Sequence, residues 1–522
     1  MRSLAGLVLA GGLALPGFSA GEAPPFEFVE ATLDDIQDGV RAGDITCEEV
    51  VSGYLRRIEA YDQQTGLNAV IFTNPHALDE ARRIDRKVAA GKPVGRLFCA
   101  PVLLKDNFDT EGMATSGGSI ALKESVPPDD AFLVARLKAA DAIIAAKTNM
   151  AEWAFSPRQT VSSSYGVTAN AYDLERVPAG SSGGSASGVA ASFGVIGMGS
   201  DTGNSIRGPS SHLALFGIRP TLGLTSRDGI IPLVFDRDVA GPMTRTVRDA
   251  ARTLTVISGY DPADPYTEVV QSRPTEDYEA YLDAGALAGR RLGVLRALVD
   301  TDGADPEVTA VFEQALKDLS AAGATLIDPF QIDDLDAHLA ADYFCPRFRY
   351  DAHRYLESLA PRAPIRDITE LLETGEFSPY IEDRLKHFAR FPVDRPPAEW
   401  DPPCPGFEAH EGRKRYRADT LASMDRVDVD AIVYPTWTNP PALLAKAVED
   451  YRGDNSQLIA PATGLPAATV PMGYSHGDLP AGLQILGRPF SEGVLFAIAY
   501  AYEQATAHRR PPAGFPELPP QP

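Results

Sequence analysis

The residues best equipped for chemistry lie in one stretch of the chain, from Val177 to Pro209. The stretch begins with a loop rich in glycine and serine, residues 180–185, and ends in a second polar loop, residues 201–205. Each loop supplies hydroxyl groups and backbone N–H groups, which serve a serine hydrolase as nucleophile and oxyanion donors. The small apolar residues between the loops, from Ala186 to Met198, predict a closely packed helix with one loop at each end.

Two other interpretations of the first loop have to be weighed. A Gly/Ser run by itself is more typical of a flexible linker, but this run continues without a break into an apolar segment, and a second polar loop follows. The residues Gly180-Ser181-Ser182-Gly183-Gly184 also fit the nucleophile elbow G-x-S-x-G, which must follow a strand. The preceding residues show no apolar alternation and include Pro178, so the required strand is missing.

A lysine upstream is a candidate base for these hydroxyl groups. Lys105 follows an apolar run of strand length, residues 99–104, and precedes a polar segment. A lysine at the end of a strand is more commonly a surface residue, but the apolar run favours partial burial here. Burial would lower the pKa of the amine, as a general base requires.

Three separated motifs resemble the core of the amidase signature family. The family pattern is close to GGSSGGS followed, about two dozen residues later, by D-x-G-G-S-I-R, and it includes an upstream P-x-x-x-K-D-N segment. The matching segments here are Gly180–Ser185, Asp201–Arg207 and Pro101–Asn107. The similarity spans most of the chain with a weak middle, and it continues through residues 147–150, 217–221, 240–243, 464–466 and 479–484.

The resemblance implies roles for individual residues. Ser205 matches the nucleophile, and Ser181 matches a bridging serine that lies on a cis peptide bond in this family. Lys105 matches the base, which would take the proton of the nucleophile through Ser181 in a Ser–Lys variant of the serine-hydrolase triad. The residues whose backbone N–H groups match the oxyanion hole are Thr202, Gly203, Asn204 and Ser205.

One position of the second polar loop, which we also call the oxyanion loop, departs from the family. Asn204 stands where glycine is common. If the position needs a positive φ, asparagine is the best tolerated substitute. We therefore expect backbone donation to survive, and we expect the asparagine side chain to affect the range of substrates.

Several nearby residues are expected to support the site. Met150 lies where the family lines its pocket, although core packing is an equal alternative, and Ser116 lies in a loop expected near the site. His212 is disfavoured as the base of a Ser-His-Asp triad, because Lys105 has the family context. The residues expected to hold the loops rather than to react are Ser182, Asp201 and Arg207.

The elements around these motifs predict an α/β fold. The capping boxes Thr32-x-x-Asp35 and Thr46-x-x-Glu49 predict two helices between residues 32 and 61. Strand-length apolar segments then alternate with helical ones, which is typical of a layered α/β protein. Together with the resemblance, this pattern indicates the amidase-signature fold, a central mixed twisted sheet covered by helices on both faces. The expected strands are 67–72, 99–104, 142–146, 291–295, 430–435, 468–470 and 483–487, and the further helices are 75–89, 130–140, 246–258, 305–322 and 493–505.

The chain has 522 residues, and residues 28–510 are expected to form a single amidase domain. Residues 331–421 diverge most from the family and are expected to roof the pocket, with an insertion that does not touch substrate as an equal alternative. Residues 1–20 predict a secretory signal peptide, cut after a position between 19 and 23, because one arginine precedes a short apolar segment. Residues 511–522 predict an extended and exposed tail.

Composition limits the partners. A formal net charge of −23 argues against nucleic acid and against an anionic membrane surface, and no later segment is long enough for a membrane anchor. The four cysteines and eight histidines show no metal-binding spacing, so no metal or other cofactor is expected. Export would permit a disulfide, for which Cys345 and Cys404 in the divergent middle are the best pair, whereas Cys99 is expected to be a buried thiol. The oligomeric state is left open.

Three functions stay open. The first is an exported amidase that cleaves a linear carboxamide, and residues 216–243 look similar to peptide amidases and other broad-range bacterial amidases, so peptide, aryl and small aliphatic amides are all candidate substrates. The second is the glutaminase subunit of an aminoacyl-tRNA amidotransferase, which shares this core but fits poorly with a signal peptide and an acidic surface. The third is a non-catalytic binding protein, which intact Lys105, Ser181 and Ser205 disfavour.

Overall fold

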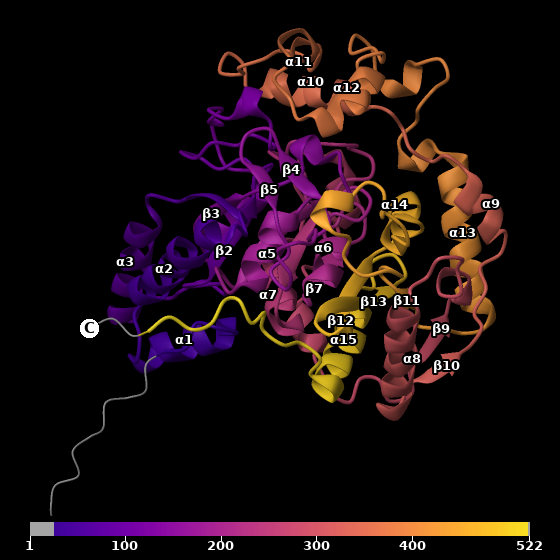
Figure 1. Ribbon diagram of the computed structural model, residues 1–522, viewed down its shortest axis with the longest axis horizontal. Helices are drawn as coiled ribbons and strands as arrows, with labels where there is room; N and C mark the ends of the chain where they lie inside the picture. Colours follow the sequence, from indigo (N-terminus) through magenta and orange to yellow (C-terminus); the bar gives the residue numbers. More distant parts are fainter. Residues whose placement is uncertain (1–25, 520–522) are drawn as a thin grey trace, which may run out of the picture.

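A computed structural model describes residues 26–519, and a mixed sheet lies at its centre (Figure 1). The strands are β1 (Val70–Thr73), β2 (Pro101–Lys105), β3 (Ile143–Thr148), β4 (Thr160–Ser162), β5 (Gly166–Thr168), β6 (Ile196–Asp201), β7 (Phe216–Arg219), β8 (Val239–Thr244), β9 (Arg291–Val294), β10 (Thr325–Ile327), β11 (Ala431–Pro435), β12 (Ala467–Ser475) and β13 (Leu479–Leu486). Eleven of them form one sheet in the order β1-β3-β2-β6-β8-β7-β12-β13-β11-β9-β10. Strands β3, β2 and β6 are parallel, as are β11, β9 and β10, and antiparallel pairs join the two groups.

Helices cover both faces of this sheet, as predicted. The helices are α1 (Leu33–Ala42), α2 (Cys47–Thr65), α3 (Ala77–Ala89), α4 (Phe132–Ala139), α5 (Gly183–Ala190), α6 (Arg207–His212), α7 (Val247–Ile257), α8 (Pro306–Ala321), α9 (Leu335–Ala340), α10 (Phe348–Ser358), α11 (Thr369–Thr374), α12 (Glu382–Phe388), α13 (Glu411–Arg426), α14 (Ala460–Thr463) and α15 (Glu492–Thr506). Along β2, Val102 shares an apolar cluster with Val134 of α4 and Leu254 of α7, whereas Leu103 packs with Val189 of α5. Since successive side chains of a strand point to opposite faces, α4 and α7 lie on one face and α5 on the other.

Local sequence signals place the helix ends well. The side chains of Thr32 and Thr46 accept hydrogen bonds from the backbone of Asp35 and Glu49, and both capping boxes are complete. The predicted strands and the predicted helices outside 186–198 are present, with ends shifted by a few residues.

The predicted helix from Ala186 to Met198 is wrong over its second half. Helix α5 ends at Ala190, and the chain reverses and returns as β6 from Ile196. Small residues are common in both elements, so composition does not mark the boundary between the helix and the strand. The chain reverses at Ser192, which has a φ of 55°. The two polar loops therefore lie side by side rather than at opposite ends of one helix.

The segment 331–421, which we call the roof segment, contains α9 to α12 and the first two thirds of α13, with long connections. In Figure 1 its helices α10, α11 and α12 lie together at the top of the view. The segment packs on the rest of the protein through an apolar cluster in which Phe348 of α10 meets Trp153 and Phe155. Tyr355 also donates a hydrogen bond of 2.8 Å to the carboxylate of Asp109.

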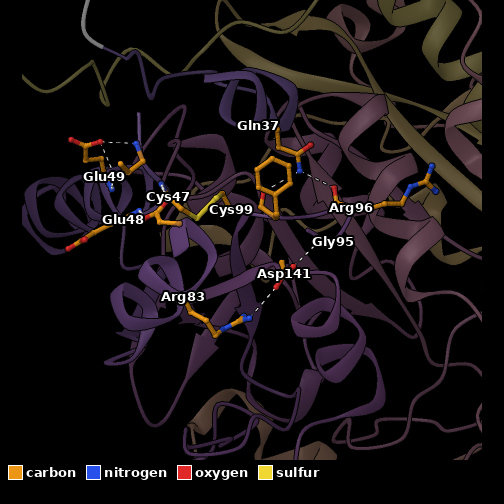
Figure 2. The surroundings of a disulfide bond; sticks show 12 residues. Gln37, Cys47, Glu48, Glu49, Arg83, Gly95, Arg96, Cys99 and Asp141 are labelled. Carbon is orange, nitrogen blue, oxygen red and sulfur yellow. Dashed lines mark hydrogen bonds and ion pairs between the residues drawn. A yellow bond between two sulfur atoms is a disulfide. The ribbon is translucent and has the colours of Figure 1, made fainter. Parts of the chain in front are cut away.

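The four cysteines form two disulfides. Cys345 pairs with Cys404 within the roof segment, as predicted. The expectation that Cys99 is a free buried thiol is wrong, because it pairs with Cys47 at the start of α2, and Figure 2 shows this bond beside Gln37 of α1. The two cysteines are 52 positions apart, and only the packing of α2 against the residues before β2 brings them together.

Removing the disulfide of the roof segment is expected to destabilise the protein. Replacing Cys345 and Cys404 by alanine frees a loop of 59 residues in the unfolded chain, so the free energy of unfolding should fall by about 2–4 kcal/mol. Thermal unfolding monitored by circular dichroism measures the loss. The Cys47→Ala/Cys99→Ala variant gives the comparison, because its disulfide closes a loop of similar length. If the Cys345→Ala/Cys404→Ala variant melted at the temperature of the oxidised protein, this disulfide would not stabilise the fold.

The C-terminal tail differs from the prediction in its burial. Residues 511–519 are irregular, as expected for an extended segment, but Phe515 is buried. Arg57 of α2 donates hydrogen bonds to the carbonyl groups of Phe515 and Pro516, and the Glu517 carboxylate accepts from the N–H groups of Phe28 and Val29. The tail therefore attaches the end of the chain to its first helices.

The predicted signal peptide lies outside the described residues. Within residues 26–519, no helix is both long enough and apolar enough to cross a membrane.

Candidate active site

Lys105 ends β2 in the interior of the protein, where it is fully buried. Its Nζ lies 2.8 Å from Ser181 Oγ, 2.8 Å from Ser200 Oγ and 3.3 Å from the Ser200 carbonyl oxygen. Burial lowers the pKa of the amine to about 7, although the negative charges of Asp238 and Asp201 act in the opposite direction. A large fraction of Lys105 is therefore neutral near pH 7 and able to accept a proton from Ser181.

The first polar loop holds Ser181 rigidly. The Gly180–Ser181 peptide bond is cis, as the family resemblance implies. A Cβ on Gly180 would lie 2.4 Å from the Ser156 carbonyl oxygen, and one on Gly184 would lie 2.2 Å from the Asn149 carbonyl oxygen. The glycines thus permit close backbone packing, which excludes a flexible linker, and no strand directly precedes the loop, which excludes the nucleophile elbow.

The second polar loop joins β6 to α6 and contains Ser205, which is almost fully buried. The backbone N–H groups of residues 202–205 donate no hydrogen bond to any other described residue, whereas the next N–H group, that of Ile206, donates to Asp201 Oδ2. All four residues line a cavity. Consecutive unpaired donors at a cavity wall are able to bind an oxyanion.

A buried ion cluster fixes the shape of this loop. The Asp201 carboxylate lies 3.2 Å from Arg207 Nε and 2.9 Å from Arg219 Nη1, and all three side chains are fully buried. Burial alone would raise the pKa of Asp201, but the two guanidinium groups hold it below its ordinary value. Arg207 also donates a hydrogen bond of 2.6 Å to the Gly203 carbonyl oxygen. Asp201 and Arg207 therefore hold the loop, as predicted.

Replacing Asp201 by asparagine is expected to cost about 3–5 kcal/mol of stability, because two buried arginines lose their counter-charge. Urea denaturation measures the loss. Glu382→Gln is the control, since it breaks a surface ion pair with Lys386 and should cost less than about 1 kcal/mol. Equal effects of the two substitutions would contradict a structural role for the cluster.

The cavity beside the second loop has a volume of about 520 Å³, which is in the range of ligand pockets. The second polar loop and the roof segment both contribute to its lining. The residues that the roof segment contributes are His338, Leu339, Ala341, Asp342, Tyr343, Phe344, Asp383, Arg384, His387 and Phe388.

Two residues predicted to contact substrate do not line this cavity. Met150 is buried in the apolar cluster that contains Trp153, and Ser116 donates a hydrogen bond to the Asp106 carboxylate. Their contact with substrate stays a prediction. Asn204 has no positive φ, and its Nδ2 donates to the Pro157 carbonyl oxygen at 3.0 Å, so its side chain occupies part of the cavity wall.

His212 is not placed to act as a base. Its ring is buried against Trp437, with the ring centroids 4.4 Å apart, and burial lowers its pKa to about 3. Two polar residues of the site had no motif to reveal them, namely Ser200, which contacts Lys105, and Arg237, which lines the cavity. Within residues 26–519, no group of three or more histidine, cysteine, aspartate or glutamate side chains is placed to bind a metal ion.

Comparison with known proteins places this chain in a family. A family model described as Amidase matches residues 49–496. Among curated proteins, a glutamyl-tRNA(Gln) amidotransferase subunit from Alkaliphilus metalliredigens is 34% identical over 493 residues, which is 91% of this chain and 96% of that protein.

Solved structures with the same fold include two kinds of enzyme. Native peptide amidase from Stenotrophomonas maltophilia is 36% identical, with a TM-score of 0.82, and the match covers 94% of this chain and 99% of that one. The corresponding glutamyl-tRNA(Gln) amidotransferase subunit from Thermotoga maritima is 27% identical, with a TM-score of 0.69, and the match covers 92% of this chain and 96% of that one.

Proposed function

Because this chain belongs to the amidase family, we propose that it hydrolyses a linear carboxamide to a carboxylic acid and ammonia or an amine. The observation that carries the proposal is the contact between buried Lys105 and Ser181, beside the unpaired N–H groups of residues 202–205. These groups supply a base and an oxyanion site around the hydroxyl of Ser205.

The proposed reaction proceeds through an acyl-enzyme. Neutral Lys105 takes the proton of Ser181, Ser181 takes the proton of Ser205, and the Ser205 oxygen attacks the carbonyl carbon of the amide. The N–H groups of residues 202–205 bind the negative oxygen of the tetrahedral intermediate. The C–N bond then breaks, and the leaving nitrogen receives the proton back through Ser181. Water, activated by the same relay, hydrolyses the ester and releases the acid.

Peptide amides are the substrates we propose to test first, because the peptide amidase of S. maltophilia is similar over nearly the whole of both chains. Purified protein is assayed for release of ammonia or amine from peptide amides, anilides and short aliphatic amides. Turnover of peptide amides is the expected result, and the absence of turnover on every class would refute the proposal.

A second candidate is the glutaminase subunit of an amidotransferase, which the names of the curated relatives favour. Such a protein would copurify with partner proteins and release ammonia from glutamine. Hydrolysis of peptide amides by the isolated chain, with glutamine left intact, would decide against this candidate.

We also propose that the protein is exported. The two disulfides support this location, since stable disulfides are typical of oxidising compartments. Cell fractionation followed by N-terminal sequencing tests the proposal. The mature chain is expected to begin between residues 20 and 24, whereas a chain that retains Met1 in the cytoplasm would refute export.

A further inference from the structure

One cation in the wall of the cavity has no hydrogen-bond or ion-pair partner for its guanidinium group among the described residues. Arg237 lies between β7 and β8, only 8% of its surface is exposed, and it lines the same cavity as Ser205. Its Nε has no hydrogen-bond partner, and its guanidinium group forms no ion pair with any described residue. A guanidinium group has five N–H donors, so this one is equipped to bind a ligand.

The acidic neighbours of Arg237 in the sequence are engaged elsewhere. The Asp236 carboxylate pairs with Arg413 at 2.6 Å. The Asp238 carboxylate accepts hydrogen bonds from the N–H groups of Leu233 and Val234 and from the Thr202 hydroxyl. Burial lowers the pKa of Arg237 to about 9, the positive charges of Arg413 and Arg219 act in the same direction, and the negative charges of Asp236 and Asp238 offset only part of this shift. A desolvated cation of this kind is stabilised best by a negative group that arrives with the ligand.

The side chain of Arg219 links the backbone of Arg237 to the oxyanion loop. Arg219 donates to the Arg237 carbonyl oxygen at 2.6 Å through Nη2, and its Nη1 lies 2.9 Å from the Asp201 carboxylate. The ring of Phe344 in the roof segment also contacts the guanidinium group, whose carbon lies 5.5 Å from the ring centroid. Arg237 is therefore in contact with the roof segment and linked through Arg219 to the second polar loop.

We propose that Arg237 binds a carboxylate group of the substrate, so that the preferred substrates are amides that carry a second, ionised carboxyl group. This inference rests on the proposed amidase function. A bidentate pair between guanidinium and carboxylate would satisfy the unpaired donors and neutralise the buried charge. Arg237 would then determine specificity without taking part in bond cleavage.

The test uses matched substrates. Monoamides of succinic, glutaric and adipic acid are compared with neutral analogues in which a methyl ketone replaces the carboxylate. The wild-type enzyme should prefer the carboxylates by about 10- to 100-fold in kcat/KM for the chain length that reaches Arg237, because charge-assisted hydrogen bonds are lost in the analogue.

Arg237→Gln should remove this preference by raising KM for the carboxylates about 10- to 100-fold, with little change in kcat and in the rates on neutral analogues. Arg237→Lys should restore part of the preference, because the charge remains but the planar fork is lost. Arg384→Gln is the matched control, since Arg384 lines the same cavity but already donates to the Phe155 carbonyl oxygen. The control should affect acidic and neutral substrates alike.

Binding measurements separate this proposal from the proposed function. Calorimetric titration with succinate, glutarate and adipate, the expected products, requires no turnover. Binding by the wild type that is lost in Arg237→Gln but kept in Arg384→Gln would support the carboxylate site even if no amide were hydrolysed. Equal binding by wild type and Arg237→Gln, or an equal loss of activity on acidic and neutral amides, would overturn it.

Discussion

Replacing Ser205 by alanine is expected to lower kcat for amide hydrolysis by about 10⁴- to 10⁶-fold while leaving the fold intact. The hydroxyl group is the proposed nucleophile, and the other hydroxyl of the oxyanion loop, that of Thr202, already donates to the Asp238 carboxylate. Rates are measured on the best substrate of the panel, and circular dichroism and the melting temperature show whether the variant is folded. Substrate binding should persist, because the cavity keeps its shape.

The matched control for this variant is Ser182→Ala. Ser182 is a buried serine of the first loop whose hydroxyl donates to the Ser200 carbonyl oxygen at 3.3 Å. Its loss should reduce stability slightly and leave most of the activity. If Ser205→Ala stayed active and Ser182→Ala were inactive, the nucleophile would have to be reassigned to Ser182.

Replacing Lys105 by alanine or methionine is expected to lower kcat by about 10⁴-fold or more, since no other base among the described residues contacts the Ser181 hydroxyl. Arginine at this position should be equally inactive, because a guanidinium group keeps its proton and cannot serve as a base. Near-normal rates in any of the three variants would show that Lys105 is not the base.

The pH dependence of the wild type tests the same assignment. Burial disfavours the charged amine and lowers the pKa of Lys105 to about 7. Below that pH the amine is protonated and cannot accept a proton, so kcat/KM should fall about tenfold per pH unit, and above it kcat/KM should reach a plateau. An activity that stays constant from pH 5 to 8, or one that falls as the pH rises through 7, would be inconsistent with a neutral lysine base.

A second buried lysine supplies the control. Lys147 lies on β3, its Nζ is 2.6 Å from the Phe108 carbonyl oxygen, and it is 3.6 Å from the Asp106 carboxylate. Lys147→Met should lower the melting temperature, because a buried carboxylate loses its partner. The rise of activity near pH 7 should remain in this variant.

The sequence by itself indicated the proposed reacting groups and determined many local structures. Ser181, Ser205 and Lys105 are identified by the resemblance of three contiguous motifs to the amidase signature family. The capping boxes at Thr32 and Thr46 are also readable, since a cap depends on residues three positions apart. The strands and helices near the C-terminus are predicted by apolar patterns that are equally local.

Other features had no local signal. Strands β6, β7 and β8 carry glycine, proline and small residues instead of a β-branched alternation, so they have no counterpart among the predicted segments. The pairing of Cys99 with Cys47 depends on how α2 packs, and the unpartnered state of Arg237 within the described part of the chain depends on which groups its acidic neighbours engage.

The assembly of the site was decided only by the tertiary structure. A continuous helix from residue 186 to 198 would separate the two polar loops by roughly 20 Å, which is too far for a proton relay between their serines. The reversal after Ala190 instead brings the first loop to the end of β6, where Ser182 bonds to Ser200 and Lys105 reaches both Ser181 and Ser200. Residue types set the available chemistry because they are local properties, whereas the distances between reacting groups follow from long-range packing of the sheet.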